Sequence, residues 1–167
     1  MRSIVMAIAL AAAGCGGGGS KAGTGPGGGS GGGDTVAAAT GRLELGEISI
    51  SESGQGLFVH ADGKVEVVDG DQKKPLGTLT ADGKFTLPDG DSGQLQDDGS
   101  FTTKEGPAPF RLEDETLVVG DTRLTIDANN VIQGGKADMS TVKVTGVTSR
   151  GTRRTALLMI GFLTLAK

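Results

Sequence analysis

The strongest constraint on the fold of this chain is a short phrase that recurs along its central part. In each copy an apolar residue is followed by two further residues, then by Asp-Gly, one polar residue and a second apolar residue. The copies occupy residues 59–65, 79–85 and 95–101, and residues 126–132 form a degenerate fourth copy with two asparagines in place of Asp-Gly and Val131 in place of the polar residue. Asp-Gly between strand-forming residues is a strong signal for a β-hairpin turn. The phrase therefore predicts a series of antiparallel hairpins.

The spacing of the apolar residues selects the register of these hairpins. A two-residue Asp-Gly loop would place His60, a polar residue, opposite an apolar one. A three-residue loop instead pairs the apolar residues with each other, provided that its last residue adopts a positive φ, which glycine and asparagine tolerate best. We therefore predict the pairs Val59–Val65, Leu79–Phe85, Leu95–Phe101 and Ile126–Ile132. The predicted structural turn residues with positive φ are Gly63, Gly83, Gly99 and Asn130.

The rest of residues 34–148 continues the hairpin pattern. Residues 110–119 predict one more hairpin, and residues 69–71 and 88–91 have the composition of turns. Pro107 and Pro109 indicate a sheet edge or a break, because proline has no N–H to donate to a strand partner. We predict an all-β domain, an antiparallel meander of about ten short strands. The sequence leaves open whether this meander forms a barrel, a sandwich or an extended sheet.

Composition limits both the core and the partners of this domain. Aromatic residues make up 3% of the chain and there is no Trp or Tyr, so we expect a thin core of Val, Ile and Leu from many short strands. All 20 acidic residues lie within residues 34–138, and only about half as many lysines and arginines accompany them there. An acidic surface repels phosphate backbones, so we predict no nucleic-acid partner.

The C-terminal segment, residues 149–167, differs from the hairpins. It contains an apolar run over residues 155–166, which is too short to span a membrane. Its Leu, Met and Ala content favours a helix that begins after Thr152, with Arg153 and Arg154 in a first turn where their charge opposes the helix dipole. A long core strand is the alternative. We expect this segment to pack on the hairpin domain, although a membrane-surface or partner-docking role is also open.

The N-terminal segment has the character of an export signal. Arg2 supplies a positive start, and residues 4–13 form a short apolar run that ends in small residues. We interpret residues 1–14 as a signal peptide. Residues 15–33 follow it and are rich in Gly and Ser, as in a flexible tether.

The run Ala12-Ala13-Gly14-Cys15 resembles the lipobox of bacterial lipoproteins, with Ala12 where the lipobox usually has leucine. Cys15 is the single cysteine of the chain. The resemblance implies that Cys15 is diacylated on sulfur, becomes the new N-terminus and holds the domain in the cell envelope. Gly16 follows it where an aspartate would signal inner-membrane retention, which by the same resemblance favours the outer membrane. The alternative is an ordinary signal peptide, cleaved near Ala13, with a chance cysteine.

Motifs for catalysis or cofactor binding are weak. Gly90-Asp91-Ser92-Gly93 is similar to short protease motifs, but the similarity covers four residues, and His60 is the single histidine that could serve as a base. We therefore predict no catalytic residue, no metal site and no cofactor. The predicted function is a lipid-anchored cell-envelope protein, a structural or interaction module that contacts the membrane through Cys15 and an envelope protein through its fold. The alternative is a carrier of a small apolar ligand or lipid in a barrel cavity, and the oligomeric state is left open.

Overall fold

The computed structural model describes residues 42–135 and 141–165, with side chains as far as residue 163. Within these ranges the chain forms a 12-stranded antiparallel sheet and one C-terminal helix. The all-β prediction is confirmed, with two strands more than expected. The elements are β1 Ile48–Glu52, β2 Gln55–Val59, β3 Lys64–Asp69, β4 Gln72–Leu79, β5 Lys84–Thr86, β6 Ser92–Leu95, β7 Ser100–Thr103, β8 Gly106–Glu113, β9 Thr116–Val119, β10 Thr122–Ile126, β11 Ile132–Gln133, β12 Lys143–Thr145 and α1 Arg150–Leu165.

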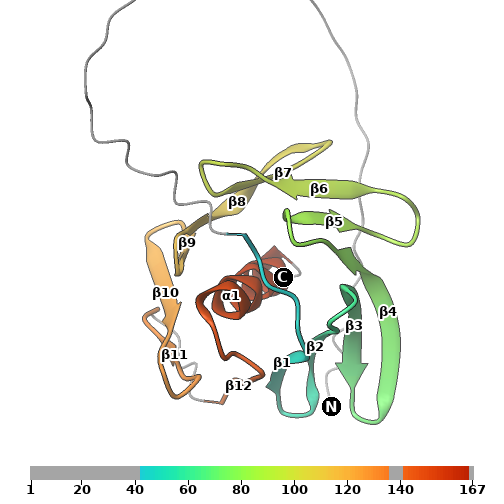
Figure 1. Cartoon of the computed structure of the whole chain (residues 1–167), viewed down its shortest axis with the longest axis vertical. Helices are drawn as coiled ribbons and strands as arrows, with labels where there is room; N and C mark the ends of the chain where they lie inside the picture. Colours follow the sequence, from blue (N-terminus) through green and yellow to red (C-terminus); the bar gives the residue numbers. More distant parts are fainter. Residues whose placement is uncertain (1–41, 136–140, 166–167) are drawn as a thin grey trace, which may run out of the picture.

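The sheet curls into a nearly closed barrel (Figure 1). From β1 to β11 each strand pairs with the next one in the chain, as a meander requires. β12 departs from this order and pairs with β1, where Ser49 lies opposite Thr145. β11 and β12 are therefore the two edge strands, and the seam of the barrel lies between them.

The four predicted hairpin registers are confirmed. Val59 lies opposite Val65, Leu79 opposite Phe85, Leu95 opposite Phe101 and Ile126 opposite Ile132. The turn residues have the positive φ angles that a three-residue loop needs, which are 86° at Gly63, 87° at Gly83, 84° at Gly99 and 62° at Asn130. Each loop also closes with the same two hydrogen bonds, shown by the first copy, where the His60 N–H donates to the Lys64 carbonyl and the Gly63 N–H to the His60 carbonyl.

Three of these loops are joined sideways to the next hairpin. The carbonyl of Gly63 accepts a hydrogen bond from the Leu79 N–H at 2.7 Å, and Gly83 and Gly99 repeat this contact with Leu95 at 3.0 Å and Leu112 at 2.8 Å. A Cβ at Gly63 would lie 2.2 Å from the Leu79 carbonyl oxygen. Glycine is therefore required here by close packing as well as by its positive φ.

The connections of the meander divide between two ends of the barrel. Because antiparallel strands alternate in direction, the four predicted loops and the turn at Asp114–Glu115 share one end, which we call the loop end. The turns after β1, β3, β5, β7 and β9 share the other, which we call the turn end. Residues 42–46 cross the loop end in front of the helix (Figure 1), and the Leu43 N–H donates to the Ala81 carbonyl there at 3.1 Å.

The C-terminal helix α1 runs through the interior of the barrel (Figure 1). The prediction of a helix is confirmed, but its predicted start after Thr152 is wrong, because α1 begins at Arg150. Ser149 is the N-cap: its hydroxyl accepts the Thr152 N–H at 3.1 Å, and the Thr152 hydroxyl accepts the Ser149 N–H at 2.9 Å. This reciprocal pair is a capping box in which threonine replaces the usual Glu or Gln. It places Arg153 and Arg154 in the second turn of the helix.

The side chains of α1 complete the core. Residues 156–160 are 0–2% exposed and face strands on several sides of the barrel. Phe162 contacts the rings of Phe85, Phe101 and Phe110 from the strands, with centroids 4.8–5.7 Å apart. The described part of the chain has no helix with the length and apolar character needed to cross a membrane.

The two prolines of β8 do not break the strand. β8 continues through Pro107 and Pro109, but β9 pairs with residues 110–113 alone. The prolines therefore lie in a stretch that has β7 on one side and extends past β9 on the other. This local edge is one of the two arrangements that the prolines predict.

Candidate functional site

The predicted lipidation site, Cys15, lies outside the described residues, as do the predicted signal peptide 1–14 and the tether 15–33. The candidate sites that the structure describes are therefore on the barrel. They comprise a histidine between two carboxylates, a shallow polar depression and a cluster of arginines at the start of α1. All three lie toward the loop end.

His60 lies at the end of β2, between carboxylates from two different parts of the chain. Its Nε2 is 3.0 Å from Glu66 Oε2, and its Nδ1 is 3.4 Å from Glu47 Oε2. The ring packs edge-on against Phe58 with centroids 4.6 Å apart. Through Glu47, this grouping joins the chain directly after the crossing segment to the wall of the barrel. Neither Glu47 nor Glu66 was predicted from the sequence as a partner of His60. The predicted register places Glu66 diagonally across from His60 and could have indicated that contact.

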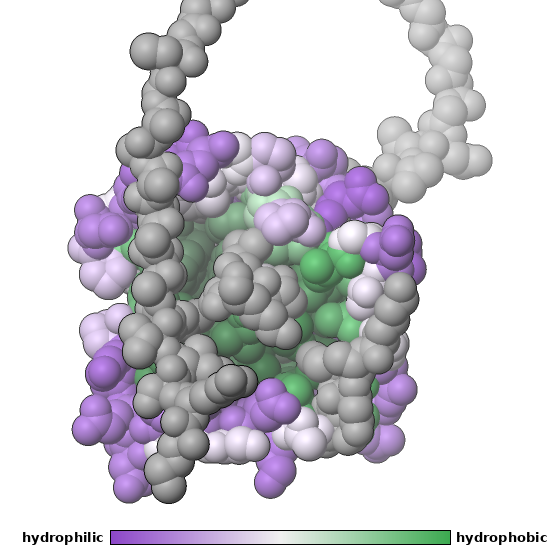
Figure 2. Space-filling model, turned by 180° about the vertical axis from the view of Figure 1, so that it is seen from behind, coloured by the Kyte–Doolittle hydropathy of each residue, from purple (hydrophilic) through white to green (hydrophobic). Residues whose placement is uncertain are grey.

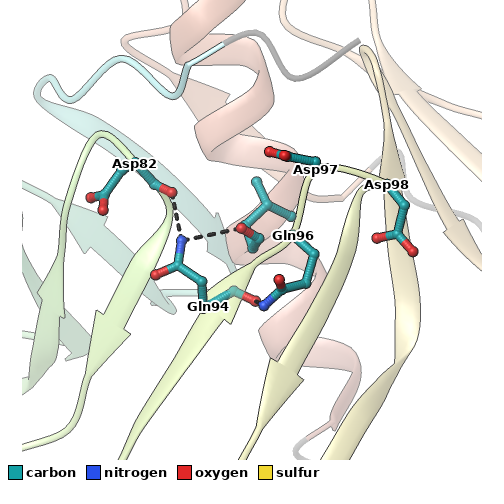
Figure 3. Close-up of a pocket in the computed structure, with 6 residues that line it drawn as sticks. Asp82, Gln94, Gln96, Asp97 and Asp98 are labelled. Carbon is teal, nitrogen blue, oxygen red and sulfur yellow. Dashed lines mark hydrogen bonds between the residues drawn. The ribbon is translucent and has the colours of Figure 1, made fainter. Parts of the chain in front are cut away.

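A shallow depression of about 600 Å³ lies between the β4–β5 and β6–β7 loops (Figure 3). Both amide hydrogens of Gln94 are already used there, because Nε2 donates to the Asp82 carbonyl at 2.7 Å and to the Leu95 carbonyl at 3.1 Å. His60 does not line the depression. The lining residues are Asp82, Gln94, Leu95, Gln96, Asp97 and Asp98.

The acids of this depression serve the loops that carry them. The Asp98 carboxylate accepts hydrogen bonds from the Ser100 hydroxyl at 2.6 Å and the Ser100 N–H at 2.9 Å, and these bonds lower its pKa. A hydrogen bond from Thr80 is the main cause of the lowered pKa of Asp82. Both groups are therefore ionised near neutral pH and are poor proton donors. The depression has polar walls that are engaged in folding, and its geometry does not support a catalytic role.

The arginines at the start of α1 pair with the turn between β8 and β9. Arg150 binds the Asp114 carboxylate, Arg153 binds Glu115, and the buried Arg154 donates to the Asp114 carbonyl at 2.5 Å. Burial lowers the pKa of Arg154, and the nearby Asp114 carboxylate opposes that effect. The sequence predicts an unfavourable dipole interaction for these arginines, and the structure places two carboxylates where they offset it. The cluster is a structural joint between the helix and the barrel wall.

The weak catalytic motif of the sequence lies away from these groups. Asp91 pairs with Lys104 at 2.6 Å, and Ser92 begins β6 at the turn end, whereas His60 lies at the loop end. No set of three or more acidic, His or Cys residues is placed to hold a metal ion in residues 42–135 or 141–163.

Comparisons with protein-family models, with curated proteins and with solved structures found no match to this chain. Function must therefore be argued from the residues of this chain. The described site residues stabilise loops or join neighbouring parts of the barrel, and none of the three groupings combines a nucleophile, a base and a cleft.

Proposed function

We propose that this protein is a lipid-anchored cell-envelope protein whose barrel acts as a structural or interaction module without catalysis. The proposed role of the barrel as a structural or interaction module is supported by the helix inside it. Residues 156–160 of α1 are almost completely buried and fill the volume that a ligand would need. The outer wall and the two ends remain as the surfaces through which the barrel can act.

The anchor half of the proposal is supported by sequence. Cys15 stands at the junction between an apolar leader and a Gly/Ser-rich stretch, in a lipobox-like context. The predicted tether after Cys15, residues 16–33, would reach about 21–25 Å on average as a flexible coil, enough to hold a small barrel clear of a bilayer surface. By this proposal Cys15 carries the lipid, and Gly16 favours the outer membrane.

The filled interior also bears on the carrier alternative. A ligand of a few hundred Å³ inside the barrel would have to displace α1, together with the contacts of Phe162 to three other phenylalanines. Removing such a helix exposes a large apolar surface to water, which is strongly unfavourable. We therefore do not propose the carrier as the function.

Metabolic labelling with a clickable fatty acid tests the anchor. Wild-type protein and the Cys15→Ser variant are expressed in a bacterium that acylates lipoproteins and then separated into membrane and soluble fractions. The expected result is label on the wild-type protein alone, with loss of membrane association in the variant. Label on both proteins, or on neither, rejects the anchor.

A further inference from the structure

A set of half-buried apolar side chains lies at the turn end of the barrel. Inward-facing residues of a strand are two positions apart. Along several strands, the inward-facing residue that follows the last fully buried one toward the turn end is half-buried and packs against the core. For example, Val119 lies two residues beyond Leu117, which is 0% exposed. We call this set the apolar mouth. It comprises Val67, Leu87, Ala108, Val119 and Val142 from the wall, and Phe162 and Leu163 from α1.

The surface view supports this description. Figure 2, seen from behind Figure 1, shows hydrophobic residues inside a border of hydrophilic ones on the part of this face that is not drawn in grey. At the opposite end, Leu43 of the crossing segment is 3% exposed, while Leu45 and Leu95 are half-buried and Val131 is 43% exposed. Both ends therefore carry some apolar surface, and the apolar mouth is the larger set that packs against the core.

The rim around the apolar mouth carries an excess of negative charge. Among the described residues, four lysines lie near the turns of this end or at the start of β12, and Lys104 is already paired with Asp91 at 2.6 Å. They are Lys73, Lys74, Lys104 and Lys143. Seven carboxylates share the rim, namely Glu52, Asp69, Asp71, Asp89, Asp91, Glu105 and Asp121.

This charge decides between the possible occupants. A bilayer rich in anionic lipids would bring like charge to the rim, and so would a second copy of the same end. A basic segment with apolar side chains matches both the apolar centre and the acidic rim. We propose that the apolar mouth binds a segment of a partner protein in which apolar residues are flanked by Lys or Arg. The inference rests on the proposed function as an interaction module and names its surface and the chemistry of its partner.

The test uses two synthetic peptides and the full-length chain. One peptide has an apolar leucine face and flanking lysines, and the other has the same leucines with every lysine replaced by glutamate. Fluorescence anisotropy of the labelled peptides measures binding. The lysine peptide should bind and should weaken as salt rises from about 0.05 M to about 0.5 M, because screening reduces charge attraction. The glutamate peptide should not bind.

Matched variants locate the binding surface. Val119→Thr keeps the shape of a residue in the mouth but places a hydroxyl against an apolar partner, and it should weaken binding by about threefold or more. Val118→Thr alters the adjacent residue on the outer face of β9 and should have no effect. Asp121→Lys, on the exposed turn after β9, should also weaken binding, whereas Asp97→Lys on an exposed loop of the opposite end should not.

Several results would overturn the inference. Equal loss with Asp121→Lys and Asp97→Lys would indicate general attraction to an acidic protein, and equal loss with both valine variants would point away from the mouth. Binding to vesicles that contain anionic phosphatidylglycerol, with no binding of the lysine peptide, would identify a membrane surface instead. The labelling of Cys15 is read separately, so loss of the anchor with peptide binding intact would reject the anchor alone.

Discussion

The two ends of the barrel use similar short connections between antiparallel strands, yet they differ in how these connections are held. At the loop end, the carbonyls of Gly63, Gly83 and Gly99 accept hydrogen bonds from the next hairpin, and residues 42–46 cross over the helix. At the turn end, a Cβ added to Gly54 or Gly70 would meet no atom within 4 Å. One end is closed by its own backbone, and the other keeps apolar side chains half-buried. The difference predicts that substitutions at the first end lower stability more than matched substitutions at the second.

The largest expected effect compares the two ends of α1. Leu157→Ala removes a side chain that is 0% exposed and should lower the free energy of unfolding by about 2–5 kcal/mol, because a cavity remains. Leu163→Ala, at the half-buried turn end, should lower it by about 1 kcal/mol, since less apolar area leaves the core. Chemical denaturation of both variants measures the difference. Equal losses of unfolding free energy in the two variants would contradict the difference in burial between the two ends of the helix.

A smaller effect is expected from two glycines with positive φ. Gly63→Ala places a methyl group 2.2 Å from the Leu79 carbonyl oxygen and should lower the free energy of unfolding by about 2–3 kcal/mol. Gly70→Ala, at the turn end, has a φ of 59° with open space around it and should cost about 1 kcal/mol. Thermal unfolding of the two variants under one set of conditions compares them. A similar change in unfolding temperature for both variants would show that the close contact between Gly63 and Leu79 adds nothing to stability.

The helix cap should have an effect of about 1 kcal/mol. Ser149→Ala removes the hydroxyl that accepts the Thr152 N–H and so breaks one half of the capping box. Ser92→Ala, an exposed serine at the start of β6, is the control and should change stability by less than about 0.5 kcal/mol. Denaturation curves report both values. A cap variant that matches the control would argue against the capping role of Ser149.

The smallest expected effect is on pH dependence at the loop end. Hydrogen bonds from Ser100 lower the pKa of Asp98 below its ordinary value of 3.8. A lowered folded pKa adds stability that is present above the ordinary pKa and is lost as pH falls through the lowered value. Acid destabilisation should therefore begin below about pH 4. Ser100→Ala should raise the pKa of Asp98 toward 3.8 and make this loss shallower, as NMR titration of the carboxyl group would show. An unchanged titration of Asp98 would contradict this account.

The parts of the fold that depend on near neighbours could be predicted from sequence. The pairs Val59–Val65 and Leu79–Phe85 are six residues apart, so turn chemistry and the apolar pattern fix them together. Barrel closure could not be predicted in this way. It depends on the pairing of Ser49 with Thr145, which are almost a hundred residues apart and carry no distinctive signal.

The same distinction applies to the candidate site residues. The start of α1 has a local signal in Ser149 and Thr152, but threonine stands where a capping box usually has Glu or Gln. The contact of His60 with Glu66 follows from the hairpin register, whereas its contact with Glu47 depends on how residues 42–46 cross the barrel. Anchoring through Cys15 stays a prediction from sequence, because that residue lies outside the described ranges.

The position of α1 in the chain has a consequence for how the protein is made. Ribosomes synthesise the twelve strands before the helix that fills them, so the hairpins emerge while their shared interior is still empty. Short hairpins without a core are at best marginally stable in water. We therefore expect the chain to stay open until residues 150–165 are present, and the domain to complete its fold in one late, cooperative event rather than hairpin by hairpin.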